Sequence, residues 1–123
     1  MISLIRSSFV EAVDPEALLS VLTPYLIKDE KVIKTFESID FFAHFTNKRI
    51  IFTYRIESTL KLRQFEIEFL PYKSIERFSY IYDEKLSQGT IQTSVCDVGF
   101  LNFSIKDKSV GEDFTKTIGE YII

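Results

Sequence analysis

Residues 45–52, with the sequence FTNKRIIF, constrain the fold more than any other part of this chain. Their centre, Asn47-Lys48, is a turn dipeptide, and residues typical of β-strands flank it on both sides. Asn tolerates the positive φ that two-residue hairpin loops require. The segment therefore predicts a β-hairpin in which Thr46 lies opposite Arg49.

This turn also fixes the face on which each side chain lies, because side chains alternate along a strand. One face is expected to form the core, and it consists of Phe41, Ala43, Phe45, Ile50, Phe52 and Tyr54. The other face pairs His44 with Ile51, Phe42 with Thr53 and Asp40 with Arg55. A shift of one residue would bury both charged residues of the last pair, so the pattern specifies one register.

Length and composition predict a single domain with a phenylalanine-rich core. The chain has 123 residues, of which 46% are hydrophobic and twelve are Phe. Its net charge is −3 and its Lys and Arg residues are dispersed, which argues against nucleic-acid binding. The single cysteine, Cys96, excludes an internal disulfide and favours a reducing, cytoplasmic location. No apolar run approaches the about 18 residues of a membrane span, and residues 1–13 lack a signal-peptide pattern.

A helix is predicted near the start of the chain. Asp14 is a good N-cap, and Pro15 suits the first helical position. Apolar residues recur at helical spacing from there to about Leu26. Pro24 disfavours the last turn, so the regular helix is expected to end near Leu22.

From residue 31 onward the hydrophobic period becomes two, which predicts strands. The strands are expected at residues 31–37, 40–46, 49–55, 61–69, 73–80, 88–95 and 99–106. The apolar side chains of the last two strands lie on one face only if the loop between them has an odd number of residues. The three residues Cys96-Asp97-Val98 are therefore the expected turn.

The chain is predicted to end in an amphipathic helix. Ser109 and Glu112 have the spacing of a capping box. The apolar stripe of this helix consists of Val110, Phe114, Ile118 and Tyr121. Such a stripe predicts that the helix packs on the sheet.

These elements predict a mainly β (α+β) fold, a partly open barrel of about seven antiparallel strands with a C-terminal helix as its cap. Residues 1–30 are expected to form an N-terminal arm and helix, and residues 31–123 a single globular unit. For residues 1–13, a strand, an arm and a helical lead-in are all compatible with the sequence.

Two motifs resemble the bacterial pleckstrin-homology (PH-like) domain family. FTNKRIIF at residues 45–52 and LPYKSIERFS at residues 70–79 are similar to the family's FTNKRLI and IPYKSI..FS. The resemblance implies a PH-like barrel from about Leu22 onward, in a small cytosolic module that assembles into homo-oligomers. It implies neither a ligand nor an activity. Residues 55–60 lack the family's glycine-rich turn, and residues 80–98 depart from its pattern.

No residue pattern predicts catalysis, a metal or a cofactor. His44 has no evident partner and Cys96 has no evident base, so neither is expected to be catalytic. The carboxylates lack metal-ligand spacing. Phosphoinositide binding in the first hairpin loop is not expected, because Glu37 and Asp40 would repel the head group.

One candidate interface lies on the outer, mixed face of the predicted hairpin. It consists of Phe42, His44, Ile51 and Thr53. Neighbouring large apolar side chains on an outer face favour a contact surface. The alternative is that the helix predicted at 15–26 covers this face within the same chain.

Lys48 and Arg49 at the hairpin turn are a weak candidate anion contact. The alternative is a solvated Lys beside an Arg that pairs with a nearby carboxylate.

Taken together, these features favour a noncatalytic binding or scaffold module that self-associates and recruits an unknown protein partner. The alternative function is a peripheral lipid- or membrane-surface-binding protein. That function requires a basic patch, which the linear sequence does not show.

Overall fold

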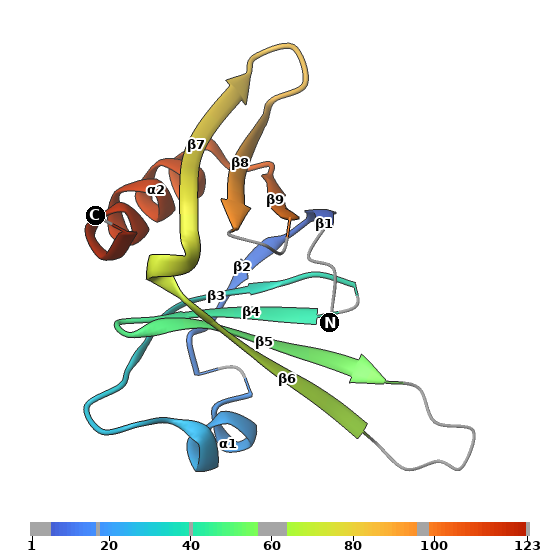
Figure 1. Ribbon diagram of the computed structural model, residues 1–123. Helices are drawn as coiled ribbons and strands as arrows, with labels where there is room; N and C mark the ends of the chain where they lie inside the picture. The colour runs from blue at the N-terminus through green and yellow to red at the C-terminus, as the bar shows by residue number, and fades with distance from the viewer. Residues whose placement is uncertain (1–5, 17, 40, 57–63, 96–98, 123) are drawn as a thin grey trace. The chain divides into compact units, whose positions relative to one another are not determined.

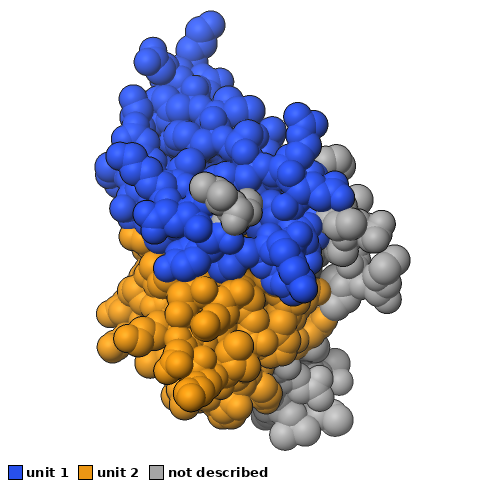
Figure 2. Space-filling view, turned by 60° about the vertical axis from the view of Figure 1, so that its left-hand side comes forward, with its two compact units in different colours: residues 1–11, 71–123 blue, residues 12–70 orange. Residues whose placement is uncertain are grey.

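The computed structural model describes residues 6–16, 18–39, 41–56, 64–95 and 99–122. The chain divides into two compact units, residues 12–70 and residues 1–11 with 71–123 (Figure 2). The described strands form two sheets, and neither sheet closes on itself (Figure 1). The predicted mainly β architecture with a C-terminal helix is therefore confirmed. Within these ranges, no helix is long and apolar enough to cross a membrane.

The five-stranded sheet has the order β2-β3-β4-β5-β6 (Figure 1). Its strands are β2 Glu11–Val13, β3 Val32–Glu37, β4 Phe41–Thr46, β5 Arg49–Ile56 and β6 Gln64–Pro71. Strands β3, β4 and β5 begin and end within about one residue of the positions predicted from the sequence. The predicted start of β6 at residues 61–63 lies outside the described residues.

The predicted register of the β4–β5 hairpin is confirmed. The paired residues are Phe41 with Tyr54, Phe42 with Thr53, Ala43 with Phe52, His44 with Ile51 and Phe45 with Ile50. The predicted core face is buried throughout, and the rings of Phe41 and Phe52 pack edge to face with their centroids 6.0 Å apart. The predicted pair of Asp40 with Arg55 lies outside the described residues, because Asp40 is not described.

The turn at Asn47-Lys48 forms for a reason other than the predicted positive φ. Among the described residues other than glycine, only Leu18, Asp29 and Ser87 have a positive φ. The Thr46 hydroxyl instead accepts hydrogen bonds from the backbone N–H groups of Lys48 and Arg49, both at 3.0 Å. A side-chain acceptor thus stabilises the turn in the conformation that ordinary residues prefer.

The predicted N-terminal helix is much shorter than expected. α1 spans only Leu19–Leu22, and a 3-10 helix at Thr23–Tyr25 follows it. Asp14 does not cap this helix, because its carboxylate accepts the Glu16 N–H at 2.9 Å and closes a separate turn. Leu18 then adopts a left-handed conformation with φ 59°, which separates that turn from α1. The expected end near Leu22 is confirmed.

The second sheet has the order β1-β9-β8-β7 (Figure 1). Its strands are β1 Arg6–Phe9, β7 Ile75–Asp83, β8 Gln88–Val95 and β9 Gly99–Ile105. β1 runs parallel to β9, so the strand alternative is the correct one for residues 6–9, and the same holds for β2 at residues 11–13. The predicted division at residue 30 stays a prediction.

The register predicted for the last hairpin is confirmed. Ile91 pairs with Phe103 and Thr93 with Leu101, and Val95 pairs with Gly99. The pairing leaves three residues between the strands, as the pattern requires. The predicted turn itself, including Cys96, lies outside the described residues.

Helix α2, Lys108–Ile122, packs on this sheet through the predicted stripe. Phe114 and Ile118 are fully buried, and the Phe114 ring lies 6.5 Å from that of Phe78 on β7. The predicted capping box is wrong, because Asp107 caps the helix instead. The Asp107 carboxylate accepts the N–H groups of Ser109 and Val110 at 2.9 and 3.3 Å.

Candidate functional site

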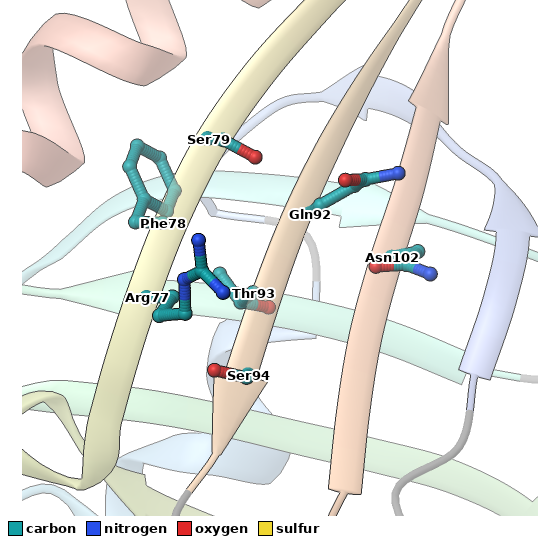
Figure 3. Close-up of a pocket in the computed structure, with 7 residues that line it drawn as sticks. All are labelled: Arg77, Phe78, Ser79, Gln92, Thr93, Ser94 and Asn102. Carbon is teal, nitrogen blue, oxygen red and sulfur yellow. The ribbon is translucent and has the colours of Figure 1, made fainter.

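A polar trough of about 390 Å³ crosses strands β7, β8 and β9 (Figure 3). Its lining consists of Arg77, Phe78, Ser79, Gln92, Thr93, Ser94 and Asn102. Strand pairing explains how these residues meet, because Arg77 lies opposite Ser94, and Gln92 lies opposite both Ser79 and Asn102. Alternation puts these five side chains on one face, whereas Phe78 and Thr93 belong to the face that α2 covers.

Arg77 is the only charged residue among the described residues that line this trough. It is exposed, and it forms no ion pair with a described carboxylate. Its neighbours contribute hydroxyl and amide groups, which carry no net charge. Among its described residues, the trough therefore presents one positive charge without a carboxylate partner, within a set of hydrogen-bonding groups.

Asn102 brings an unsatisfied acceptor to the same site. Its Oδ1 is buried and has no hydrogen-bond partner in the part of the chain that the structure describes. A buried acceptor without a donor costs about 1–3 kcal/mol. A bound molecule that donates a hydrogen bond there would recover this free energy once the Asn102 side chain had turned to bring its buried Oδ1 into the trough.

β7 is an edge strand beside the trough. Among the described strands it pairs only with β8, over almost its whole length of nine residues. Its trough-side residues Arg77, Ser79 and Ile81 are exposed. Ile81 is 53% exposed, and Leu86 in the β7–β8 turn is 68% exposed. This edge combines backbone groups that pair with no other described strand with exposed apolar side chains.

The opposite face of β7 is tightly packed around Tyr80. A Cβ atom on Gly89 would lie 2.4 Å from the Tyr80 Oη, and a Cβ on Gly111 of α2 would lie 2.7 Å from it. The Oη is buried without a partner among the described residues. Burial raises the pKa of Tyr80, and the nearby Glu112 and Tyr82 raise it further. The two glycines allow α2 to approach the sheet that carries the trough.

The predicted interface residues lie inside the chain rather than on its surface. The exposed fractions are 6% for Phe42, 0% for His44, 0% for Ile51 and 1% for Thr53. Of the two alternatives, an exposed contact surface and a face covered within the same chain, this burial contradicts the first and agrees with the second. Segment 25–30 is bonded to this face, because Arg49 donates to the Tyr25 carbonyl at 2.8 Å and Thr46 to Glu30 at 2.7 Å. An interface role for the four residues stays a prediction.

His44 is a buried core residue, not a surface one. Its ring stacks on Phe42 at 6.0 Å, and its nitrogens lie 3.4 and 3.2 Å from the hydroxyls of Thr35 and Thr53. Burial lowers the pKa of His44 to about 4. The histidine is therefore neutral at physiological pH and serves packing.

Arg49 pairs with a carboxylate, as the alternative interpretation of the turn predicts. Its Nε and Nη2 donate to the two Glu30 oxygens, each at 3.0 Å, and its guanidinium lies 4.3 Å from the Phe69 ring centroid. Burial alone would raise the pKa of Glu30, but hydrogen bonds from Arg49, Thr46 and the Ile27 amide lower it. Arg49 is thus occupied within the chain, whereas Lys48 is exposed.

The trough residues were not predicted from the sequence. They occupy alternate positions on three strands, and two strand pairings are needed to bring Arg77 near Asn102. The exposed polar alternation of residues 75–95 is the only local signal, and it is common to half-solvated strands.

The two sheets and the helix at the end of the chain define a PH-like fold, and known structures share it. A pleckstrin-homology domain protein from Shewanella loihica superposes with a TM-score of 0.74 and 22% identity, covering 94% of this chain and 99% of that one. A pleckstrin homology domain from Shewanella amazonensis gives a TM-score of 0.62 and 23% identity, covering 90% of each chain. A PH-domain-containing protein from Exiguobacterium sibiricum gives a TM-score of 0.65 and 12% identity, covering 93% of this chain and 62% of that one.

The sequence also matches the bacterial PH domain family over residues 4–82. The chain therefore belongs to the bacterial PH domain family. The resemblance carried by the FTNKRIIF and LPYKSIERFS motifs is confirmed. No curated protein matches the chain.

Proposed function

We propose that this chain is a noncatalytic binding module that self-associates and recruits a protein partner along β7. Membership of the bacterial PH domain family supports the general class, because PH domains are as a rule binding modules rather than enzymes. The observation that carries the proposal is the nine-residue edge strand β7 beside an open polar trough. Such an edge offers backbone donors and acceptors to an added strand.

The exposed side chains of β7 favour a protein as the occupant. Strand addition obtains affinity from main-chain hydrogen bonds, and the alternate side chains give specificity. Ile81 and Leu86 supply apolar contacts at one end of the edge, and Arg77 supplies charge at the other. A second copy of this chain or a partner in extended conformation fits this arrangement.

Light scattering after gel filtration tests self-association. The wild type is expected to elute with a mass well above 14.4 kDa. Ile81→Lys is expected to reduce that mass, because an added charge on an edge strand opposes pairing. Ile39→Lys is the matched control, since Ile39 is 87% exposed and lies outside β7. A monomeric wild type at high concentration would contradict self-association, and equal masses for the two variants would exclude the β7 edge.

A second candidate function, binding to a membrane surface, is supported by a patch that the tertiary structure assembles. Tyr25, Ile27 and Phe69 are 50%, 52% and 40% exposed. The exposed Lys48 lies near the segment that carries Tyr25 and Ile27, because the preceding Asn47 donates a hydrogen bond to the Asp29 carbonyl at 3.0 Å. Exposed aromatic and apolar groups beside lysines suit an anionic lipid surface.

Co-sedimentation with vesicles tests this second function. The chain is expected to bind vesicles that contain phosphatidylserine, and to lose binding as salt rises. Lys48→Glu should abolish the binding, whereas Lys116→Glu on α2 should not. If the fraction bound to vesicles changes neither with salt nor with Lys48→Glu, the membrane proposal is contradicted.

A further inference from the structure

The geometry points to a specific occupant for the trough, namely the carboxyl end of an extended polypeptide. We propose that Arg77 pairs with the terminal carboxylate and that the Asn102 side chain turns into the trough, so that its Oδ1 accepts a backbone N–H from the same peptide. This inference rests on the proposed protein-binding function and specifies the part of the partner that is recognised.

The positive charge of Arg77 is the reason to expect a carboxylate as the bound group. Arg77 is the only charged residue among the described liners, so no acidic side chain among them repels an anion. A guanidinium matches a carboxylate in a fork with two parallel hydrogen bonds. Its exposed side chain is not committed to any described carboxylate, unlike that of Arg49, which Glu30 already holds.

The buried acceptor Asn102 Oδ1 favours a ligand that also carries an N–H donor, such as a peptide amide, over a second anion. Asn102 Oδ1 needs a donor, and a peptide supplies one backbone N–H per residue. The hydroxyls of Ser79 and Ser94 and the amide of Gln92 line the space between Arg77 and Asn102. They offer both donors and acceptors to the peptide backbone.

The spacing also fits a short extended segment. Asn102 lies two strands away from Arg77 and two residues along the sheet. Strand separation of about 4.8 Å and a rise of about 3.3 Å per residue put their Cα atoms about 12 Å apart. Two or three extended residues and the Arg77 side chain span that distance. A volume of about 390 Å³ also lies within the range of small-ligand sites.

Titrations of the full chain, followed by backbone amide NMR shifts, test the proposal with three probes. The probes are N-acetyl-trialanine, its C-terminal amide, and acetate. The free acid is expected to give saturable shifts in residues 77–79, 92–94 and 102. Its dissociation constant is expected to be at least tenfold lower than that of the amide and of acetate.

Variants assign the two contacts. Arg77→Gln is expected to weaken binding of the acid to the level of the amide. Asn102→Thr is expected to weaken binding of both peptides and to leave the weak acetate shifts unchanged. Lys116→Gln removes one exposed positive charge from α2 in the same unit and is expected to bind as the wild type does. Unchanged amide spectra away from the trough show that each variant is folded.

Each other outcome overturns a defined part of the proposal. Equal affinity for acid and amide would exclude recognition of the terminal carboxylate but would keep the proposed peptide-binding edge. Equal affinity for the acid and acetate would show an anion site without peptide recognition. The absence of saturable shifts in the trough would overturn the inference. Self-association through β7 would not be affected by that result, because the light-scattering measurement tests it separately.

Discussion

Arg49 holds the buried carboxylate of Glu30 with a two-point contact, Nε to Oε2 and Nη2 to Oε1, each 3.0 Å long. The side chain of Glu30 is fully buried, whereas that of Arg49 is 20% exposed. Thr46 donates to the same carboxylate at 2.7 Å. The hairpin turn thereby holds segment 25–30 against the sheet.

Arg49→Met is expected to lower the free energy of unfolding by about 3 kcal/mol, because it leaves a buried carboxylate without its counter-charge. Chemical denaturation measures this loss. Arg49→Lys is the matched control, and it should lose less, because it keeps the charge but not the two-point geometry. The double variant Glu30→Gln with Arg49→Met should recover part of the loss, and the prediction fails if it does not.

The buried His44 makes stability depend on pH. Its pKa is lowered from 6.5 to about 4 by burial, so below pH 6.5 the unfolded chain binds a proton that the folded chain does not. Stability should therefore fall as the pH drops from 6.5 to about 4, by about 3 kcal/mol in total. In His44→Gln this part of the decline should disappear in denaturation curves at several pH values. Parallel pH profiles for the two proteins would contradict the assignment.

Two glycines of α2 should respond in opposite ways to alanine. A methyl group added at Gly119 would have no atom within 4 Å, so Gly119→Ala should stabilise the chain by about 1 kcal/mol through helix propensity. A Cβ on Gly111 would lie 2.7 Å from the Tyr80 Oη, so Gly111→Ala should destabilise by about 1–2 kcal/mol. Thermal unfolding of both variants checks the difference, and equal shifts would show that α2 does not approach β7 so closely.

Removal of the Tyr80 hydroxyl should not harm the fold. Its Oη is buried without a partner among the described residues, so Tyr80→Phe should stabilise the chain by up to about 1 kcal/mol. It should also reduce the cost of Gly111→Ala, because the nearest of the clashing Tyr80 atoms is removed. A double-mutant cycle by chemical denaturation measures this coupling. Additive effects would argue against the contact.

Asn47→Gly separates two explanations of the hairpin turn. If a positive φ were required, glycine would stabilise the turn. The Asn47 side chain instead accepts the Lys31 N–H at 2.8 Å and donates to the Asp29 carbonyl at 3.0 Å. Asn47→Gly is therefore expected to destabilise the chain by about 1–2 kcal/mol in urea denaturation. Lys48→Gly at the neighbouring exposed position serves as a control for chain flexibility.

Residue order was enough to predict most of the strands, the β4–β5 register, the stripe of α2 and the family. Each of these depends on local turn chemistry or on the alternation of side chains along one or two neighbouring segments, which the order of residues specifies directly. It did not predict that α1 is short, because the Asp14 carboxylate can close a local turn as readily as it caps a helix.

Which side chains are buried, and which of them meet, depends on contacts between distant segments. Alternation along β4 and β5 shows two faces but not what covers the second one, so His44 and Ile51 were expected on an outer face. Segment 25–30 is held at the turn end of that face by bonds to Arg49, between residues about 20 positions apart. Arg77 and Asn102 likewise converge only after β7, β8 and β9 have paired, so the trough has no signature in the order of the residues.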